Sequence, residues 1–425
     1  MFTRRDFLGA AGAGLIAAPL AWSAQPEGAR RKKMAIVSTV WRYHSHAQHM
    51  GDRFLVGYPM HGKWHRPELD VVSLYADQQP PEADLSRPRE QEFKFKIYPT
   101  IAETLRCGGD KLAVDAVLII GEHGEYPLSE FGQTKYPRYE FFKQVTDVFR
   151  EDGRAVPVFN DKHLSWNWEW AVEMVDTAHA LKFPFMAGSS LPGTWRMPAV
   201  DLPWGAEVDE VMCVAIGGPD SYDFHALEVI QCMAERRRGG ETGVAWIQAL
   251  RGDAVWKAME AGSWDAGGFS RPLFEACLSR SQTLAPPRSG FTHRYPTDAE
   301  IRQLEKDPIA YRFQYNDGLK ATMLLMNGVV GDFTFAAKLK EQAEPLSTLF
   351  YLPPNPNVTY SAILMSNVEK MFLTGKAVYP VERTLLTTGL VAAAMKSLAS
   401  GQKRIEMPGP AVRYQVSQES TFCQS

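Results

Sequence analysis

The stretch VDAVLIIGEH, residues 114–123, opens with apolar and β-branched side chains and ends in a polar turn. Such a run is typical of a strand buried on both faces of a parallel sheet. Similar apolar runs occur at residues 34–40, 69–75, 155–159 and 183–187. Helical periodicity lies between them, at residues 99–105, 139–150 and 168–181. Because strands that alternate with helices require right-handed crossovers, we predict an α/β domain with a doubly wound parallel sheet over residues 34–188.

A different pattern follows and predicts a second domain, of the α+β class, over residues 189–405. Two turn motifs, Asn316-Asp317-Gly318 and Asn327-Gly328, supply the positive φ angles that hairpins need. We therefore expect a largely antiparallel sheet, with a meander over residues 311–337. Residues 261–298 are rich in Gly, Pro and Ser and are expected to loop over the surface. The remaining predicted elements are a strand at 211–216, helices at 222–238 and 381–399, and a C-terminal tail at 406–425.

The composition is that of a soluble globular protein. The chain has 425 residues, of which 45% are hydrophobic and 22% charged, and this length corresponds to two or three domains. A formal net charge of −3 provides no global basic field, so nucleic acid is not expected as a partner. Five cysteines without a C-x-x-C motif do not make a disulfide scaffold or a zinc ribbon.

The N-terminal segment has the pattern of an export signal. Arg4 and Arg5 precede an apolar run over residues 8–22, which is too short to cross about 30 Å of hydrocarbon. Small residues near position 24 permit cleavage, so residues 1–24 are predicted to be a twin-arginine signal peptide. We therefore expect the twin-arginine export machinery as a partner, a periplasmic or extracellular mature protein, and no stable membrane insertion.

Four segments of the mature chain resemble the Gfo/Idh/MocA family, named after glucose–fructose oxidoreductase and inositol dehydrogenase. These segments are residues 32–47, 98–123, 158–164 and 383–405. The resemblance implies a Rossmann-like N-terminal domain, NAD or NADP as the cofactor, and a sugar, polyol or cyclitol hydroxyl as the group acted on. It also implies a homodimer or homotetramer formed through the second sheet, one face of which would need a cover.

The glycine-rich turn of that family is changed in this chain. The closing His-Ala of the family motif is present as His46-Ala47, but Ser38, Val40 and Tyr43 stand where its three glycines occur. Those glycines allow a tight turn and a close approach of the backbone to pyrophosphate, and a valine resists positive φ. Binding of a nicotinamide cofactor therefore stays open. The candidate cofactor-binding residues are Ser38, Val40, His46, Asp77, Glu122 and Asp161.

Lys162 and His225 carry the chemistry that the resemblance implies. Lys162 stands where the family has a lysine that hydrogen-bonds the substrate hydroxyl, and it follows a buried strand. His225 stands where the family has a general base, and an imidazole can take a hydroxyl proton near neutral pH. We predict that the two side chains face each other across a cleft between the domains, with Asp223 or Asp161 orienting one of them.

A second interpretation depends on the strand ends alone. Carboxyl ends of neighbouring parallel strands share one edge of a sheet, and histidines and carboxylates follow several of them here. These side chains could bind a divalent metal such as Zn²⁺, Mn²⁺ or Fe²⁺. They could also cap turns or bind substrate hydroxyls without a metal. The metal ligands would be His44, His46, His123 and His163, with His49, Glu122 and Asp161 beside them.

Tryptophans at alternate positions follow this region. Trp166, Trp168 and Trp170 either stack on a sugar or anchor the core at the start of a helix. Three functions stay open at the level of the sequence. They are an exported oxidoreductase acting on a carbohydrate-like hydroxyl, a metal-dependent hydrolase or lyase on the same fold, and a sugar-binding protein without catalysis.

Overall fold

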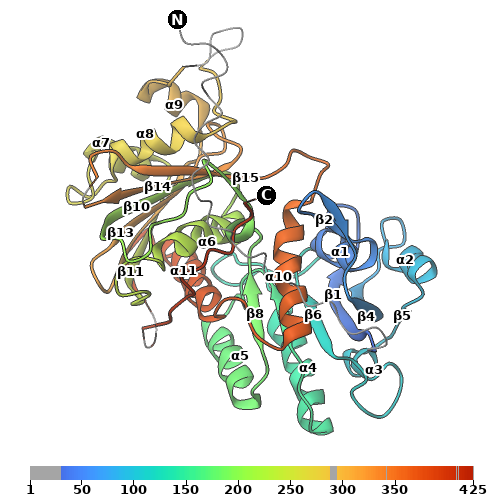
Figure 1. Ribbon diagram of the computed structural model, residues 1–425. Coiled ribbons are helices and arrows are strands. Elements are labelled where there is room, and N and C mark those ends of the chain that lie inside the picture. The colour runs from blue at the N-terminus through green and yellow to red at the C-terminus, as the bar shows by residue number, and fades with distance from the viewer. Residues whose placement is uncertain (1–29, 288–293, 341, 408, 410, 425) are drawn as a thin grey trace, which may run out of the picture. The chain divides into compact units, whose positions relative to one another are not determined.

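The computed structural model describes residues 30–287, 294–340, 342–407, 409 and 411–424. Residues Lys32–Ser425 form one compact unit, whose elements are labelled in Figure 1. The predicted signal peptide, residues 1–24, lies outside the described residues, so export stays a prediction. Among the helices of the described part, none is long and apolar enough to cross a membrane.

A six-stranded parallel sheet confirms the predicted doubly wound fold. Strand β1 pairs with β4 on one side and with β6 on the other, so the strand order reverses at β1. Ligands of α/β sheets bind at such a reversal, beyond the carboxyl ends of the strands. In spatial order the strands are β5 (Lys96–Ile97), β4 (Leu69–Gln78), β1 (Lys32–Val40), β6 (Ala116–Ile120), β7 (Val158–Asp161) and β8 (Phe185–Gly188).

Helices cover both faces of this first sheet. One face packs against the predicted helices, which are α3 (Ile101–Arg106), α4 (Arg138–Asp152) and α5 (Trp168–Leu181). Thr100 caps α3 by accepting a hydrogen bond from the Glu103 amide. Smaller elements between β1 and β5 are η1 (Ala47–Gly51), β2 (Tyr58–Met60), β3 (Lys63–His65) and α2 (Ser86–Phe93).

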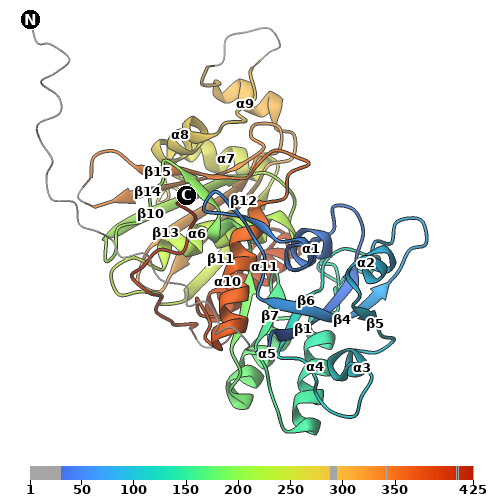
Figure 2. The ribbon, with the colours of Figure 1, turned by 45° about the vertical axis from the view of Figure 1, so that its right-hand side comes forward.

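The chain returns to the first sheet near its C-terminus. The second face of that sheet packs against α1 (Asp52–Val56) and α10 (Tyr360–Thr374), and α10 lies beside β6 in Figure 1 and Figure 2. The predicted domain boundary between residues 188 and 189 does not account for this return of the chain. The first sheet therefore depends for its cover on residues that sequence reasoning assigned to the second domain.

The second sheet has eight strands and is mixed but mostly antiparallel, which confirms the predicted α+β class for this part of the chain. β12 and β13 form the expected hairpin around residues 316–318. In spatial order the strands are β16 (Ile405–Glu406), β11 (Val244–Arg251), β12 (Ile309–Tyr315), β13 (Lys320–Leu325), β10 (Val208–Ala215), β14 (Phe333–Leu339), β15 (Leu346–Tyr351) and β9 (Trp195–Met197).

The predicted meander over residues 311–337 is wrong at its second turn. β10 lies between β13 and β14, parallel to the first and antiparallel to the second. Asn327 does not close a hairpin here. Its side chain accepts from the Gly217 amide over 2.6 Å and donates to the Gly217 carbonyl over 3.0 Å, which joins the end of β13 to the loop after β10.

Helices cover both faces of the second sheet as well. α6 (Tyr222–Ala234) and α11 (Glu382–Ala399) pack on one face, with the short η2 (Leu191–Gly193) beside α6. The opposite face packs against α7 (Asp253–Ala261), α8 (Arg271–Arg280) and α9 (Asp298–Leu304). Two expectations are corrected: residues 261–298 contain a packed helix, and the sheet face that was expected to need a partner is covered by this chain. Homo-oligomerisation stays a prediction without that physical reason.

Candidate active site

The loops after β1, β6, β7 and β8 bring polar side chains together at one edge of the first sheet, which we call the rim. The loops comprise residues 41–46, 121–123, 162–165 and 189–190. The Lys162 amide donates to the Gly188 carbonyl oxygen over 3.1 Å, which joins the last two loops. The predicted site residues that follow these strands therefore share one edge of the sheet.

His46 and Asp161 form a hydrogen-bonded dyad at the rim. Nδ1 of His46 lies 2.6 Å from Oδ2 of Asp161; Asp161 is fully buried and His46 is half-buried. Because a carboxylate only accepts, Nδ1 carries the hydrogen and Nε2 keeps its lone pair. The amide of His46 donates to Nδ1 of His123 over 3.3 Å, which fixes the loop. The dyad is thus an imidazole base oriented by a carboxylate.

Lys162 belongs to a buried ionic cluster beside the dyad. Its Nζ lies 3.2 Å from Oε1 of Glu122 and donates to the Ser221 carbonyl oxygen over 3.3 Å. The second Glu122 oxygen binds the guanidinium of Arg138, which is fully buried. Burial alone would raise the pKa of Glu122, but the charges of Lys162 and Arg138 outweigh it and hold that pKa well below its usual range. Two of the three Lys162 N–H groups are thus used, and one is left for a ligand.

His225 approaches the rim from helix α6. Its Nδ1 lies 2.6 Å from Oγ of Ser189, in the loop after β8. Burial lowers its pKa well below the usual value, and the positive charge of Lys162 lowers it further. The imidazole of His225 is therefore neutral at pH 7. That Lys162 and His225 face each other across a cleft stays a prediction, although the charge of Lys162 acts on His225.

Asp223 does not orient either catalytic candidate, so this prediction is wrong. One carboxylate oxygen accepts from the amides of Ser221 and Phe224 over 3.0 and 2.7 Å. The other accepts from the Tyr311 hydroxyl over 3.0 Å. A carboxylate at the start of a helix satisfies free backbone N–H groups there, and this one is fully occupied in that role.

The backbone is strained at three residues of the rim and at Asp220, in the neighbouring loop after β10. His44, His123, Lys162 and Asp220 have φ angles of 58°, 70°, 64° and 60°, in the left-handed region that such residues rarely adopt. Of the other non-glycine residues with positive φ in the described chain, Lys94, Cys107 and Lys182 end helices. His61 lies in the turn between β2 and β3, and Gln402 follows α11. Strain that gathers where no helix ends is characteristic of functional sites.

Buried polar atoms without partners also gather at the rim. Native proteins satisfy nearly all such atoms, so each exception calls for a bound water, a ligand or a catalytic role. Within the described chain, the unpartnered buried atoms at or near the rim include Nε2 of His49, Oδ1 of Asn160, Oδ1 of Asp161, Nδ1 of His163 and Oδ1 of Asp220. Their number at one place favours a polar ligand.

The metal interpretation is wrong in its ligand set. Among the residues that the structure describes, no three His, Cys, Asp or Glu side chains are arranged to hold a metal ion. Nε2 of His163, which a metal would need, lies 2.9 Å from a nitrogen of the Arg138 guanidinium. Burial and nearby positive charge lower the pKa of His123 to about 4. A divalent cation would meet the repulsion of Arg138 and Lys162 here.

The turn after β1 does not fit a dinucleotide. Pyrophosphate binds to free backbone N–H groups at the start of the first helix. In this chain the His44 amide donates to the Gln48 side chain over 2.5 Å, the His46 amide to His123 over 3.3 Å, and the Gln48 amide to Ser45 Oγ over 3.4 Å. The protein's own side chains thus occupy the donors that a phosphate would need.

The other candidate cofactor residues do not restore that fit. Ser38 and Val40 are buried within β1, and the Ser38 hydroxyl donates to a carbonyl of the neighbouring strand over 3.4 Å. Asp77, at the end of β4, accepts from the Tyr75 and Tyr126 hydroxyls over 2.8 and 2.6 Å. The carboxylate that would bind a ribose is thereby engaged with tyrosines. Glu122 is paired with cations, as described above.

Sequence reasoning missed Arg138, Ser189 and Asp220. Ser189 follows a predicted buried strand, so the strand-end argument could have found it. Asp220 accepts from the Thr134 amide over 2.6 Å and ties the loop before α4 to the rim. Arg138 begins α4 and is fully buried, and no local pattern signals that a lone arginine folds inward.

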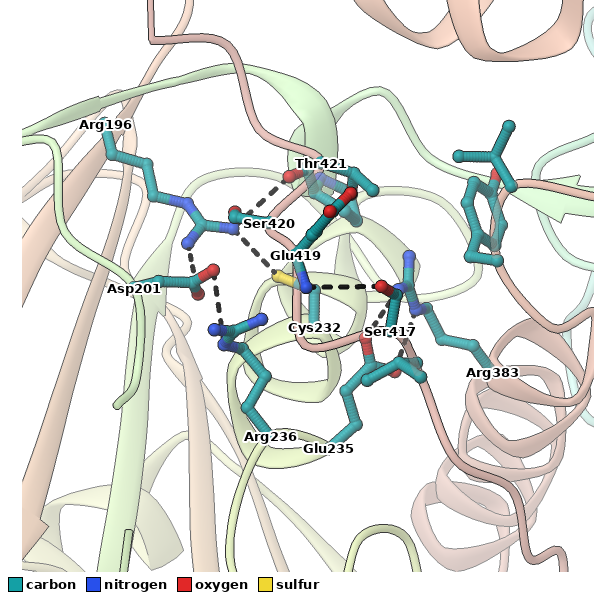
Figure 3. A pocket seen from close by; sticks show the side chains of 14 residues that line it. Arg196, Asp201, Cys232, Glu235, Arg236, Arg383, Ser417, Glu419, Ser420 and Thr421 are labelled. Carbon is teal, nitrogen blue, oxygen red and sulfur yellow. Dashed lines mark hydrogen bonds and ion pairs between the residues drawn. The ribbon is translucent and has the colours of Figure 1, made fainter. Parts of the chain in front are cut away.

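A polar pocket apart from the rim is too small for a substrate. Figure 3 shows it under the C-terminal tail, where Arg196 and Arg236 pair with Asp201, and Arg383 with Glu235. Its volume is about 30 Å³, which is the share of one water molecule in the liquid. Since its charges are paired internally, it joins the tail to α6 and α11.

The solved structures that this chain resembles include inositol dehydrogenases. Myo-inositol dehydrogenase from Lactobacillus casei, in complex with NAD(H) and myo-inositol, aligns over 90% of this chain and 98% of its own, with 11% identity and a TM-score of 0.54. Apo scyllo-inositol dehydrogenase from the same organism covers 89% and 98%, with 11% identity and a TM-score of 0.52. GenD2 from gentamicin A biosynthesis, in complex with NAD, covers 90% and 99%, with 13% identity and a TM-score of 0.52.

Sequence comparison adds nothing to this likeness, because no family model and no curated protein sequence matches. The structural similarity spans most of the chain and includes both sheets. The chain therefore has the fold of the inositol dehydrogenases, with a rim whose side chains occupy the backbone donors that a dinucleotide would need.

Proposed function

We propose that this protein is an exported acid–base enzyme, a lyase or an isomerase, acting on a sugar-like carbonyl compound at the rim. The observation that carries the proposal is the His46–Asp161 dyad beside the Lys162–Glu122 pair. A base oriented by a carboxylate, next to a fixed cation, is what removal of a proton α to a carbonyl requires.

The residues have separate roles in this step. Nε2 of His46 takes a proton from the carbon next to the carbonyl group, and the C–H electron pair forms the double bond of an enolate. The remaining N–H of Lys162 stabilises the negative charge that develops on the carbonyl oxygen. In an isomerase His46 then returns the proton to carbon. In a lyase the enolate electron pair expels the hydroxyl group of the β carbon, which leaves as water with the proton from His46, so either step is balanced without an oxidant. Neutral His225 binds a substrate hydroxyl.

The sugar-like class rests on an exposed aromatic ring at the same place. Tyr222 is 46% exposed at the start of α6, and its ring centroid lies 5.9 Å from that of His225. Phe333 stacks behind it, at 6.4 Å and an interplanar angle of 9°. A supported, exposed aromatic face beside polar side chains suits the apolar face of a sugar or cyclitol ring.

Deuterium exchange tests the proposal without assuming a product. The purified protein would be incubated in D₂O with keto sugars, sugar acids and inosose-type cyclitols, and exchange at the carbon α to the carbonyl followed by NMR. His46→Ala and Asp161→Asn should each slow exchange by about 10²–10⁴-fold. His179→Ala is the control, because that side chain is 61% exposed on α5. Absence of exchange with the wild-type protein across this panel would overturn the proposal.

A nicotinamide-dependent oxidoreductase is the second candidate, and the fold favours it. The likeness to dehydrogenases solved with NAD(H) covers about nine-tenths of the chain, and Lys162 stands at the position of the family's lysine. NAD or NADP would have to bind without the backbone donors of the turn after β1. Nicotinamide absorbance in the supernatant of heat-denatured, natively exported protein would support this candidate. If nicotinamide is found and α-proton exchange is not, the oxidoreductase replaces the lyase or isomerase as the proposed function.

A further inference from the structure

The loop over residues 129–135 borders a second, separate cavity. One side of this loop contacts the rim, where the Thr134 amide binds Asp220 over 2.6 Å. Residues of the same loop line a cavity of about 470 Å³, together with the start of α5, the end of α11 and β16. This volume lies within the range of about 300–1,000 Å³ that small-molecule sites occupy.

Two tryptophans form the aromatic wall of this cavity. Trp168 is held rigidly, because a Cβ on Gly389 of α11 would lie only 2.7 Å from its ring. That glycine lets the indole lie directly against the helix. Trp166 meets Trp170 edge to face at 5.0 Å, and Nζ of Lys135 lies 5.1 Å from the centre of its ring. The aromatic surface is thus fixed before any ligand arrives.

Polar groups complete the lining. The side chain of Gln133 is buried and donates to the Trp166 carbonyl oxygen over 3.0 Å, which sets the position of the loop against α5. The buried indole N–H of Trp166 has no partner among the described residues. Charged side chains around the opening are Glu130, Glu169, Glu406, Lys135 and Lys396. Their signs nearly balance, so no strongly charged ligand is favoured.

We propose that this cavity, named here the tryptophan cavity, is a second binding site for a neutral sugar, distinct from the rim. Rigid indole faces take the apolar face of a pyranose ring, while carboxylates, an amide and ammonium groups bind its hydroxyls. Binding at this site needs no chemistry at the rim, so the inference stands independently of the proposed function. Because one loop borders both places, a bound sugar also holds that loop against Asp220.

Saturation-transfer NMR and calorimetry with glucose, maltose and cellobiose test the site in the full mature protein. We expect saturable, millimolar binding that Trp166→Ala weakens about tenfold, the loss of one stacking contact. Ala392→Phe should have the same effect by filling the cavity without removing an aromatic wall. Trp204→Ala, at a tryptophan elsewhere that is 44% exposed, should leave the affinity unchanged.

Comparing Trp166→Ala with Ala392→Phe distinguishes loss of the binding site from unfolding of the protein. Trp166→Ala removes packing and could disturb the protein, whereas Ala392→Phe adds a side chain at a half-buried surface position; unchanged circular dichroism is required of both. Absence of saturable binding to wild-type protein at tens of millimolar sugar would overturn the proposal. Binding that both variants retain would also overturn it, since the sugar would then lie elsewhere.

Discussion

Glu122→Gln is the substitution whose effect on stability the structure defines best. Glutamine keeps the shape of the side chain but removes the charge that pairs with Lys162 and Arg138. All three side chains are buried, with exposed fractions of 6%, 3% and 0%. Glutamine offers one acceptor oxygen to these two cations, so either Lys162 or Arg138 would lose its partner at this position. Leaving buried charge uncompensated lowers the free energy of unfolding by about 3–5 kcal/mol.

The pH dependence gives this prediction its sign. The pKa of Glu122 is held well below its unfolded value of 4.5 in the folded protein, so its charge stabilises the fold fully above pH 4.5. That contribution is lost as the pH falls through the folded-state pKa. The difference between wild type and Glu122→Gln should therefore be constant from pH 7 down to about 5 and should shrink at lower pH.

Urea denaturation at several pH values measures this difference. Glu92→Gln, on the exposed side of α2, is the matched control and should change stability by less than about 0.5 kcal/mol. Adding Lys162→Met to Glu122→Gln removes one unpaired cation and should recover part of the loss. A loss below about 1 kcal/mol at pH 7 would refute the ionic cluster. A difference that does not change between pH 7 and pH 3 would refute its assignment to Glu122.

Other substitutions test the rim and the export signal. Asp220→Asn should stabilise the protein at pH 8 and not at pH 4. Burial raises the pKa of this carboxyl to about 7, so the folded protein loses stability as the pH rises from the unfolded-state pKa through that value. Urea denaturation at both pH values checks the sign. Gly217→Ala should displace Tyr222, since the φ of Gly217 is +105° and the added Cβ would lie 2.1 Å from that ring; a lower melting temperature and weaker substrate binding are expected. Replacing both arginines of the N-terminal pair by lysine should leave the precursor in the cytoplasm, and equal periplasmic yield on immunoblots would contradict the twin-arginine assignment.

The first sheet was predictable because its signals are local. Buried parallel strands are continuous apolar runs, and Thr100 marks a helix start by a side chain that caps the next turn. Helix α8 carried similar signals, since Ser270 accepts from the Leu273 amide and a proline follows it. The general Gly, Pro and Ser content of residues 261–298 obscured them. Composition averaged over a window was a poorer guide than the cap itself.

The second sheet was harder because strand order is not local. Asn327-Gly328 is a hairpin signal by sequence, yet the Asn327 side chain binds Gly217, 110 residues away. The prediction that Asp223 orients a catalytic residue was wrong for a related reason. A carboxylate at the start of a helix has backbone N–H donors within reach, and Asp223 binds those donors instead. The type of a residue limits which hydrogen bonds it can form, and its neighbours in the tertiary structure determine which of these it does form.

The strand ends predict that polar side chains gather at the rim. The chemistry of the rim depends on the glycines and free backbone N–H groups that are missing after these strands. Where related folds are expected to keep glycines and open backbone donors, this chain has Ser38, Val40 and Tyr43, and side chains occupy the donors of the same turn. The cluster of positive-φ residues and unpartnered buried atoms there lowers stability and brings no packing in return. Proteins retain such features where function needs them. We therefore expect the rim to be a functional site, in which a fixed imidazole and fixed cations stand in place of dinucleotide contacts.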